Sequence, residues 1–370
     1  MEEMIRLLAA ELGQKEQYVE NVVKLLDEGN TIPFIARYRK ELHGAMDDTT
    51  LRTLADRLQY LRNLAQRREE IRRGIGEKLT DELSAAIDAA KTLSELEDLS
   101  RPYKPKRRTR ATVAKEKGLE PLAQQLFAQS RDLPAPEELA QAYLDAEKGV
   151  ETVDDALAGA SDIIAETISD DASIRKALRA LMQKQAVLRV TAVKGKEEET
   201  SPYQTYYDFT QPVAKLQGHQ VLAVNRGERE GFLKAEIELD REQALVCVRR
   251  AVLIPGGGAT AFVRAAAEDA YDRLIAPSME RELRSALTDE ANEGAIHNFA
   301  LNLRPLLMQP PVRGRVTMGL DPGYSHGCKV AVVDATGKVL DTAMVYPTFS
   351  KAKREEALNT LEKLIRKHDV

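Results

Sequence analysis

The chain has 370 residues, of which 43% are apolar, 31% charged and 5% aromatic, with no tryptophan and a formal net charge of -5. This length predicts two or three domains with hydrophobic cores, and the composition favours a soluble, helix-rich protein. The sequence shows neither a signal peptide nor an apolar run of the roughly 18 residues that span a membrane, so we expect a cytoplasmic protein without a membrane partner.

Apolar residues in the first hundred positions recur at helical spacing. One helix is predicted at 19–26 and ends at Gly29, and a longer one is predicted at 51–64. Thr92 followed by Glu95 matches a capping box that opens a further helix. Together these patterns predict a helical bundle.

A cluster of cations and one aromatic residue lies early in this helical region. Arg37, Arg39 and Lys40 surround Tyr38, which could stack on a base while the cations hold a phosphate backbone. The alternative interpretation is a turn in which Phe34, Ile35 and Tyr38 face the core. Both interpretations stay open at the level of sequence.

The strongest charge asymmetry follows the helical bundle. Residues 101–118 hold eight basic residues and one acid, a net charge of +7, so the rest of the chain carries -12. The field of such a run extends about 10 Å in ordinary salt and predicts a local anion-binding face, with nucleic acid as the leading candidate. The candidate phosphate-binding residues in the run are Lys104, Lys106, Arg107, Arg108 and Arg110. The alternative is a solvated surface loop.

Helical spacing continues through 121–182, where small residues at 156–160 permit close packing. β-branched or alternating patterns then predict strands at 187–193 and 232–239. The glycine run at 254–260 lacks the Gly-Lys-Ser/Thr ending of a phosphate-binding loop and predicts a flexible link. We expect no cofactor.

The next helical region is expected to be interrupted at Pro277, to restart with Ser278 as its N-cap, and to end at Pro310 and Pro311. The pattern then changes to strands at 316–320, 329–333 and 339–346. A final helix, capped by Ser350, follows them.

Asp321 ends the first of these C-terminal strands. In an RNase H-like nuclease such an acid would hold a divalent metal, and in an actin-like kinase the hairpin would cradle phosphate. The acids after it are not well placed to join it: Asp334, Asp341, Glu355, Glu356, Glu362 and Asp369. The five histidines show no metal-ligand spacing, and the isolated Cys247 and Cys328 favour neither a disulfide nor a zinc site. We therefore predict no catalytic residue and no metal site, with Asp321 kept only as a remote metal candidate.

Five segments, in order along the chain, resemble the Tex family of bacterial transcription-accessory proteins, which are related to a eukaryotic transcription elongation factor. These segments are 31–41, 101–111, 194–199, 226–231 and 319–323. The turn at 324–328 departs from the Arg-Thr-Gly type expected of bacterial members.

The resemblance implies a mainly α protein with three parts. These are an N-terminal helical region with a helix-turn-helix-like unit (1–200), a central mixed then helical scaffold with small β elements (201–311), and an incomplete α/β YqgF domain of RNase H-like fold (312–370). Family members continue into helix-hairpin-helix and OB-fold segments, which this sequence does not contain. If the last domain is incomplete, its first strand should have an unpaired edge that is either covered or prone to pairing between molecules.

The function that the resemblance implies is RNA or DNA binding in transcription, with RNA as the expected ligand and no enzymatic activity. One alternative is a metal-dependent, resolvase-type nuclease that uses Asp321. Another is a scaffold for protein interactions that docks on RNA polymerase or ribosome components of the transcription and translation machinery. The oligomeric state and the choice between RNA and DNA are not determined by the sequence.

Overall fold

The computed structural model describes residues 1–104, 107–309, 314–323 and 325–370, and within them the chain is mainly helical, as predicted. It forms two compact units, Met1–Asn292 and Glu293–Val370. The candidate residue Lys106, the expected helix end at Pro310 and Pro311, and the start of the 324–328 turn lie outside the described residues. The division into 1–200, 201–311 and 312–370 and the helix-turn-helix-like unit stay predictions.

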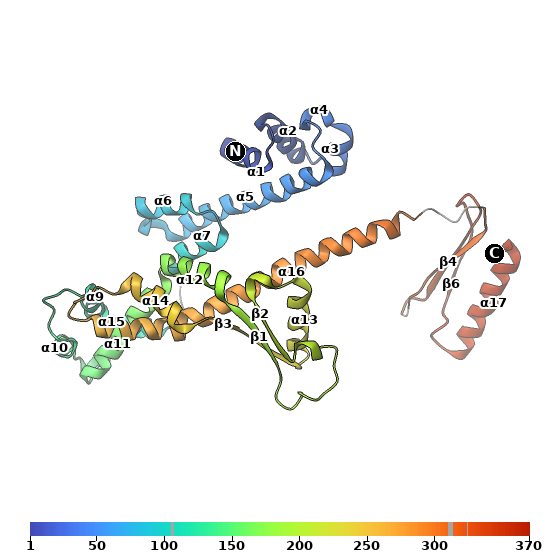
Figure 1. The fold of residues 1–370 in the computed structure, drawn as a ribbon. Helices are drawn as coiled ribbons and strands as arrows, with labels where there is room; N and C mark the ends of the chain where they lie inside the picture. The colour runs from blue at the N-terminus through green and yellow to red at the C-terminus, as the bar shows by residue number, and fades with distance from the viewer. Residues whose placement is uncertain (105–106, 310–313, 324) are drawn as a thin grey trace. The chain divides into compact units, whose positions relative to one another are not determined.

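The first unit begins with a bundle of helices, drawn in blue in Figure 1. These helices are α1 (Glu2–Leu12), α2 (Glu16–Asp27), α3 (Ile32–Tyr38), α4 (Lys40–His43) and α5 (Asp48–Ile75). Their core includes Leu8, Val19, Ile35 and Leu54, which are fully buried. The predicted helices at 19–26 and 51–64 are confirmed as parts of α2 and α5.

Two short helices connect this bundle to the basic run. They are α6 (Asp81–Ala89) and α7 (Leu93–Ser100), and a 3-10 turn at Arg101–Tyr103 follows. The Thr92 hydroxyl accepts from the Glu95 amide at 3.2 Å, which confirms half of the capping box. The Glu95 carboxylate accepts from the Lys91 amide at 2.7 Å, one residue earlier than a capping box requires.

The largest core of the unit lies around α11. The helices in this part are α8 (Arg110–Glu116), α9 (Glu120–Ala128), α10 (Pro136–Gln141), α11 (Val153–Asp170) and α12 (Ala172–Gln185). A Cβ atom at Gly159 would lie 2.3 Å from Leu119 Cδ1 and 3.3 Å from Ala114 Cβ. The small residues at 156–160 therefore do permit close packing of α8 on α11.

A small antiparallel sheet with strand order β2-β1-β3 follows, together with α13 (Gly218–Arg229). Its strands are β1 (Val187–Ala192), β2 (Asp208–Pro212) and β3 (Leu233–Glu238). The predictions for β1 and β3 are confirmed. Sequence did not predict β2, because it is a short edge strand that ends in proline.

The unit continues through α14 (Arg241–Val252) and α15 (Thr260–Asp269), a π-helical turn at Ala270–Ile275, and the first part of α16 (Ala276–Leu307), which passes into the second unit at Glu293. The expected interruption at Pro277 and cap at Ser278 are wrong, because helical structure runs on from Thr260 to Leu307. Pro277 lies just after the π-helical turn, so the proline falls next to an irregular turn of a continuous helix rather than at a helix end.

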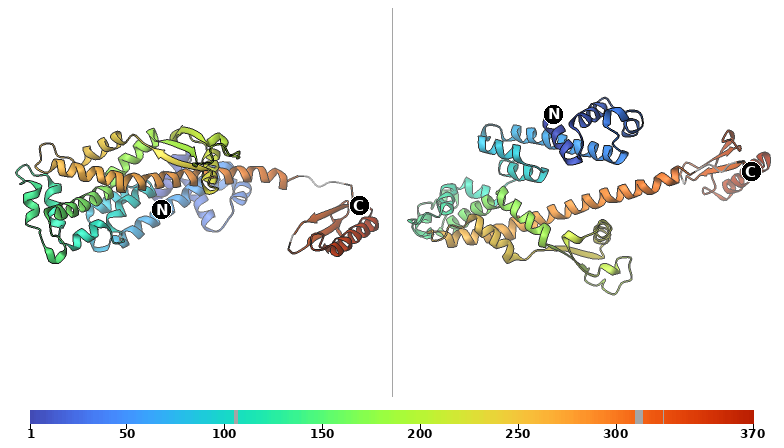
Figure 2. Two further views of the ribbon diagram at one scale, coloured as in Figure 1. Left: turned by 90° about the horizontal axis from the view of Figure 1, so that it is seen from below. Right: turned by 45° about the horizontal axis from the view of Figure 1, so that its top comes forward.

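The second unit contains a three-stranded antiparallel sheet of order β4-β5-β6 and the helix α17 (Lys351–His368). Its strands are β4 (Thr317–Asp321), β5 (Cys328–Val333) and β6 (Val339–Val345), which confirms the predicted meander. Figure 2 shows α17 along the sheet, where Ala357 and Leu364 pack against Val330 and Val332. The Ser350 hydroxyl caps α17 by accepting from the Lys353 amide at 3.2 Å. Among the described residues β4 pairs only with β5, so it has the expected free edge.

Within the described ranges, no helix combines the length and apolar character that crossing a membrane requires.

Candidate nucleic-acid interface

The basic run is attached to the rest of the first unit by ion pairs at its beginning. The Arg101 guanidinium contacts the Asp170 carboxylate of α11 at 3.2 Å, and Lys104 forms an ion pair with Glu97 of α7. Burial by itself would raise the pKa of the Glu97 carboxyl, but hydrogen bonds from Arg67 and Lys104 outweigh it and lower the pKa below its ordinary value. Arg101 and Lys104 are therefore held in place by acids.

The later cations of the run are less constrained. Arg108 lies 3.3 Å from Glu116 in a well exposed pair that contributes little stability. Arg107 and Arg110 are exposed and have no ion-pair partner in the part of the chain that the structure describes. Thr109 caps α8 by accepting from the Thr112 amide at 3.1 Å, which fixes the direction in which Arg110 begins the helix. These cations are free to contact an anion.

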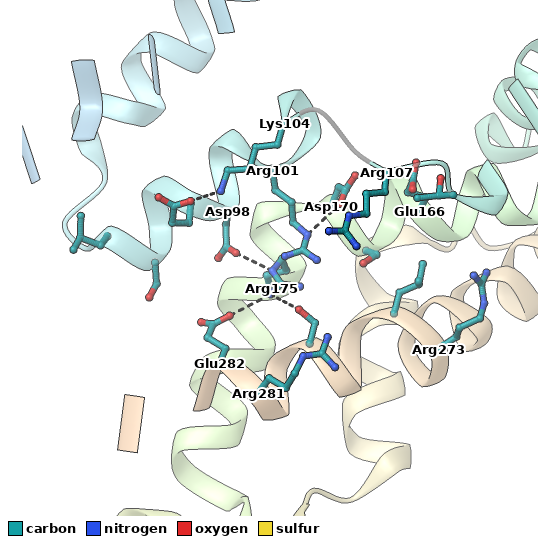
Figure 3. A pocket seen from close by; sticks show the side chains of 17 residues that line it. Asp98, Arg101, Lys104, Arg107, Glu166, Asp170, Arg175, Arg273, Arg281 and Glu282 are labelled. Atoms are coloured by element: carbon teal, nitrogen blue, oxygen red, sulfur yellow. Dashed lines mark hydrogen bonds and ion pairs between the residues drawn. The ribbon is translucent and has the colours of Figure 1, made fainter. Parts of the chain in front are cut away.

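The beginning of the run opens onto a pocket of about 680 Å³ within the first unit (Figure 3). The predicted residues Lys104 and Arg107 line it together, whereas Arg108 and Arg110 are not among its lining residues. Cations from distant parts of the sequence also line it, from α12, from the π-helical turn and from α16. These are Arg175, Arg273 and Arg281.

The floor of the pocket is a buried ion network. Asp98 accepts from Arg175 Nε at 2.8 Å and from Arg179 Nη2 at 2.7 Å. Glu282 accepts from Arg179 Nε at 2.6 Å and from Arg175 Nη2 at 3.2 Å. Burial would lower the pKa of Arg179, but its bonds to Glu282 and Asp98 raise that pKa instead, so the guanidinium stays charged. The network joins α7, α12 and α16.

The second predicted cluster lies on α3 and α4. The Arg39 guanidinium lies over the Phe34 ring, 5.1 Å from its centroid, and the Phe34 and Tyr38 rings are 5.3 Å apart. Tyr38 is 56% exposed, whereas Ile35 is fully buried, so the turn faces the core through Ile35 and solvent through Tyr38.

The cations of this second cluster differ in exposure. Arg37 and Lys40 are exposed and Arg39 is half-buried. Together with Tyr38 they form a cationic surface with an aromatic face, a combination that suits single-stranded nucleic acid. Its residues are not among those that line the pocket beside the basic run.

Asp321 lies at the exposed end of β4, and its Cα atom is paired with that of Lys329 on β5. Among the described residues, no group of three or more His, Cys, Asp and Glu side chains is suited to hold a metal ion. A cation opposite Asp321 makes binding of a second positive charge there less favourable.

Sequence reasoning missed Arg175, Arg179 and Arg281. Arg175 and Arg179 have the four-residue spacing of one helix face, which is the only local signal of their shared role. Their carboxylate partners, Asp98 and Glu282, lie at least 77 residues away in sequence.

The fold and these surfaces define a mainly helical protein with cationic faces and a small C-terminal α/β unit. Three family models match it in order along the chain: the Tex-like protein N-terminal domain over 2–76, Tex central region-like over 132–299, and the Tex protein YqgF-like domain over 315–370. The chain belongs to the Tex family.

Similar curated proteins occur in bacteria and in humans. Protein tex of Bordetella pertussis is 41% identical over 389 residues, covering 99% of this chain and 48% of that protein. Transcriptional accessory protein Tex of Neisseria gonorrhoeae is 40% identical over 377 residues, with 99% and 48% covered. S1 RNA-binding domain-containing protein 1 of Homo sapiens is 32% identical over 378 residues, with 97% and 37% covered. The chain spans about half the length of the bacterial relatives it matches.

Proposed function

We propose that this chain binds nucleic acid, with RNA as the preferred ligand, as part of a non-catalytic transcription-accessory protein in the cytoplasm. The observation that carries the proposal is the contrast within the basic run. Arg101 and Lys104 are held by acids, while Arg107 and Arg110 are exposed and have no acid partner among the described residues. Fixed cations next to free ones suit successive phosphates along a strand.

Two further observations support the proposal. Tyr38 is exposed beside Arg37, Arg39 and Lys40, which provides a stacking surface for an unpaired base. Relatives of this chain are named as a transcriptional accessory protein and as a protein containing an S1 RNA-binding domain.

The test measures binding of the purified chain to a labelled single-stranded RNA and to a labelled duplex DNA of the same sequence. Fluorescence anisotropy reports the affinity for each ligand at several salt concentrations. The proposal predicts binding to both that weakens with salt, with the RNA bound more tightly. If the chain bound neither ligand at low salt, the proposal would be overturned.

The non-catalytic part of the proposal rests on the surroundings of Asp321, which lies opposite Lys329 in the sheet. The test is incubation of the chain with branched and single-stranded nucleic acid in the presence of magnesium or manganese. We expect intact substrate. Metal-dependent cleavage that disappears in Asp321→Asn would establish the nuclease instead.

Components of RNA polymerase are the protein partners that this proposal favours, because its bacterial relatives are named for transcription. Ribosome components stay a second prediction. A pull-down with purified polymerase and purified ribosomes, before and after nuclease treatment, separates direct protein contacts from contacts bridged by nucleic acid. If neither polymerase nor ribosomes were recovered with the chain, this part of the proposal would be wrong.

A further inference from the structure

The pocket beside the basic run has an unusual charge arrangement. Its lining contains cations and acids in nearly equal number, from helices that are distant in sequence. The cations are Arg101, Lys104, Arg107, Arg175, Arg273 and Arg281, and the acids are Glu97, Asp98, Glu166, Asp170 and Glu282. The formal charge of the described lining residues is therefore +1.

The acids of the lining are all engaged. Glu97 pairs with Lys104 and Asp170 with Arg101, while Glu166 also takes part in an interaction. Asp98 and Glu282 each accept from both Arg175 and Arg179 in the buried network described above. Four of the five carboxylates are thus already paired with protein cations, and Glu166 is engaged as well.

Three arginine groups in the same pocket are not fully used. Arg107 and Arg281 are exposed and have no ion-pair partner within the described ranges. Nη1 of Arg175 is buried and has no hydrogen-bond partner among the described residues, although the whole residue is only 1% exposed. In Figure 3 Arg101 and Arg107 lie on one side of Arg175, and Arg281 approaches from α16 on the other.

Buried polar groups in proteins are normally hydrogen-bonded, and positive charges that share one pocket repel each other. An anion that accepts from several arginines at once relieves both costs. Phosphate fits this arrangement well, because it carries about -1.5 to -2 charges at neutral pH and offers several acceptor oxygens in different directions. Guanidinium groups match its geometry with paired N–H donors.

We propose that this pocket is a binding site for a single phosphate group, held by Arg107, Arg281 and the floor formed by Arg175. The phosphate is either free inorganic phosphate or the 5′-terminal phosphate of a nucleic acid strand. The second source rests on the proposed function, since the strand would follow the basic run into the pocket at Arg107. A volume of about 680 Å³ is large enough for a terminal nucleotide as well as its phosphate.

The experiment first measures the thermal stability of the whole chain in sodium phosphate and in sodium chloride of equal ionic strength. A ligand that binds only the folded state raises the melting temperature as its concentration increases. We expect phosphate to raise it for the wild type, and to have no more effect than chloride for Arg281→Gln. Arg264→Gln replaces an exposed arginine of α15 that is not in the pocket lining, and should respond like the wild type.

A second variant, Arg107→Gln, changes a loop residue outside regular structure. It tests the same site if Arg281→Gln fails to fold. Both variants should lose the phosphate response while keeping the wild-type circular dichroism spectrum. Equal responses to phosphate and chloride in the wild type, or a full phosphate response in both variants, would overturn the proposal.

The source of the phosphate is then determined by measuring the affinity of the chain for two short RNAs of the same sequence. One carries a 5′-phosphate and the other a 5′-hydroxyl. Tighter binding of the 5′-phosphorylated RNA by about tenfold, lost in Arg281→Gln, identifies a strand terminus, since one charge-assisted contact has about this effect. Equal binding of the two RNAs together with a phosphate response identifies free phosphate. The thermal measurement uses no nucleic acid, so failure of RNA binding and failure of the phosphate site are distinguished.

Discussion

Asp98 on α7 and Arg175 on α12 form a buried ion pair, with Nε of the arginine donating to the carboxylate at 2.8 Å across 77 residues of sequence. Their side chains are 6% and 2% exposed. Because Arg175 also donates to Glu282 on α16, this pair connects three helices at the base of the pocket beside the basic run. It positions the start of the basic run, which follows α7 directly.

Asp98→Asn should destabilise the first unit by about 3–5 kcal/mol, because it leaves the buried Arg175 and the partly buried Arg179 short of a negative charge. Glu362→Gln is the control, since it breaks an exposed ion pair with Arg366 and should cost less than about 1 kcal/mol. Urea unfolding followed by circular dichroism measures both. If the urea midpoints of the two variants shifted by similar amounts, the buried network would contribute no more stability than a surface ion pair.

The glycine run between α14 and α15 is a packed turn rather than the flexible link that its sequence predicts. A Cβ atom at Gly257 would lie 2.4 Å from the carbonyl oxygen of Gln129 and 3.0 Å from Gln129 Cβ. The Gln129 side chain in turn accepts from the Ile254 amide at 3.1 Å and donates to the Val252 carbonyl at 2.9 Å.

Gly257→Ala should therefore destabilise the first unit by about 1–3 kcal/mol through overpacking against backbone. Gly294→Ala is the opposite case: a Cβ there meets nothing within 4 Å, and the residue lies inside α16. Replacing it should leave stability unchanged or raise it by up to about 1 kcal/mol. The melting temperature should fall for Gly257→Ala and stay the same or rise for Gly294→Ala. A melting temperature of Gly257→Ala equal to that of the wild type would contradict the packed turn.

Tyr38→Ala should weaken binding of single-stranded RNA by about tenfold, because a stacked aromatic contributes about 1–3 kcal/mol per base. Binding of duplex DNA should change far less, since its bases are already stacked. Tyr38→Phe keeps the ring and should bind both ligands like the wild type. The variants should fold, because Tyr38 is 56% exposed. Anisotropy titrations with both ligands measure the effect, and equal losses for RNA and duplex would exclude stacking.

In the second unit, Asp341 of β6 holds the end of α17. Hydrogen bonds from Lys367, at 2.8 Å, and then from His368, at 3.1 Å, lower the pKa of the Asp341 carboxyl from 3.8 to about 2. A carboxyl whose pKa is lowered by folding stabilises the folded state above its unfolded pKa. This stabilisation is lost as the pH falls from 3.8 to about 2.

Hydrogen exchange of the α17 amides over this pH window should show falling protection in the wild type after correction for intrinsic rates. Asp341→Asn should show low protection that does not depend on pH across the window. Asp369→Asn replaces an exposed carboxylate without an ion pair among the described residues, and should keep the wild-type pH dependence. A pH-dependent loss in Asp341→Asn would assign the effect to another group.

Local patterns predicted much of this fold and little of the pocket. The strands β1, β3 and β4 to β6 and the cap at Ser350 follow from alternation and capping residues. The continuous helix through Pro277 was missed because the π-helical turn that precedes this proline has no signal in the local sequence pattern. The partnership of Asp98 with Arg175 has no local signature, since only the packing of α7 on α12 brings the two side chains together.

The central claim is that the free cations of the basic run contact phosphates of a bound strand. It is tested most directly by the slope of log K against log salt concentration for single-stranded RNA, comparing the wild type with a variant in which Arg107, Arg108 and Arg110 are glutamine. Each lost phosphate contact changes the slope by about 0.7 for a single strand, so we predict a slope shallower by about 2. A control variant with glutamine at the exposed Arg131, Arg250 and Arg264 should keep the wild-type slope. Equal slopes for the wild type and the Arg107, Arg108 and Arg110 variant would contradict the claim.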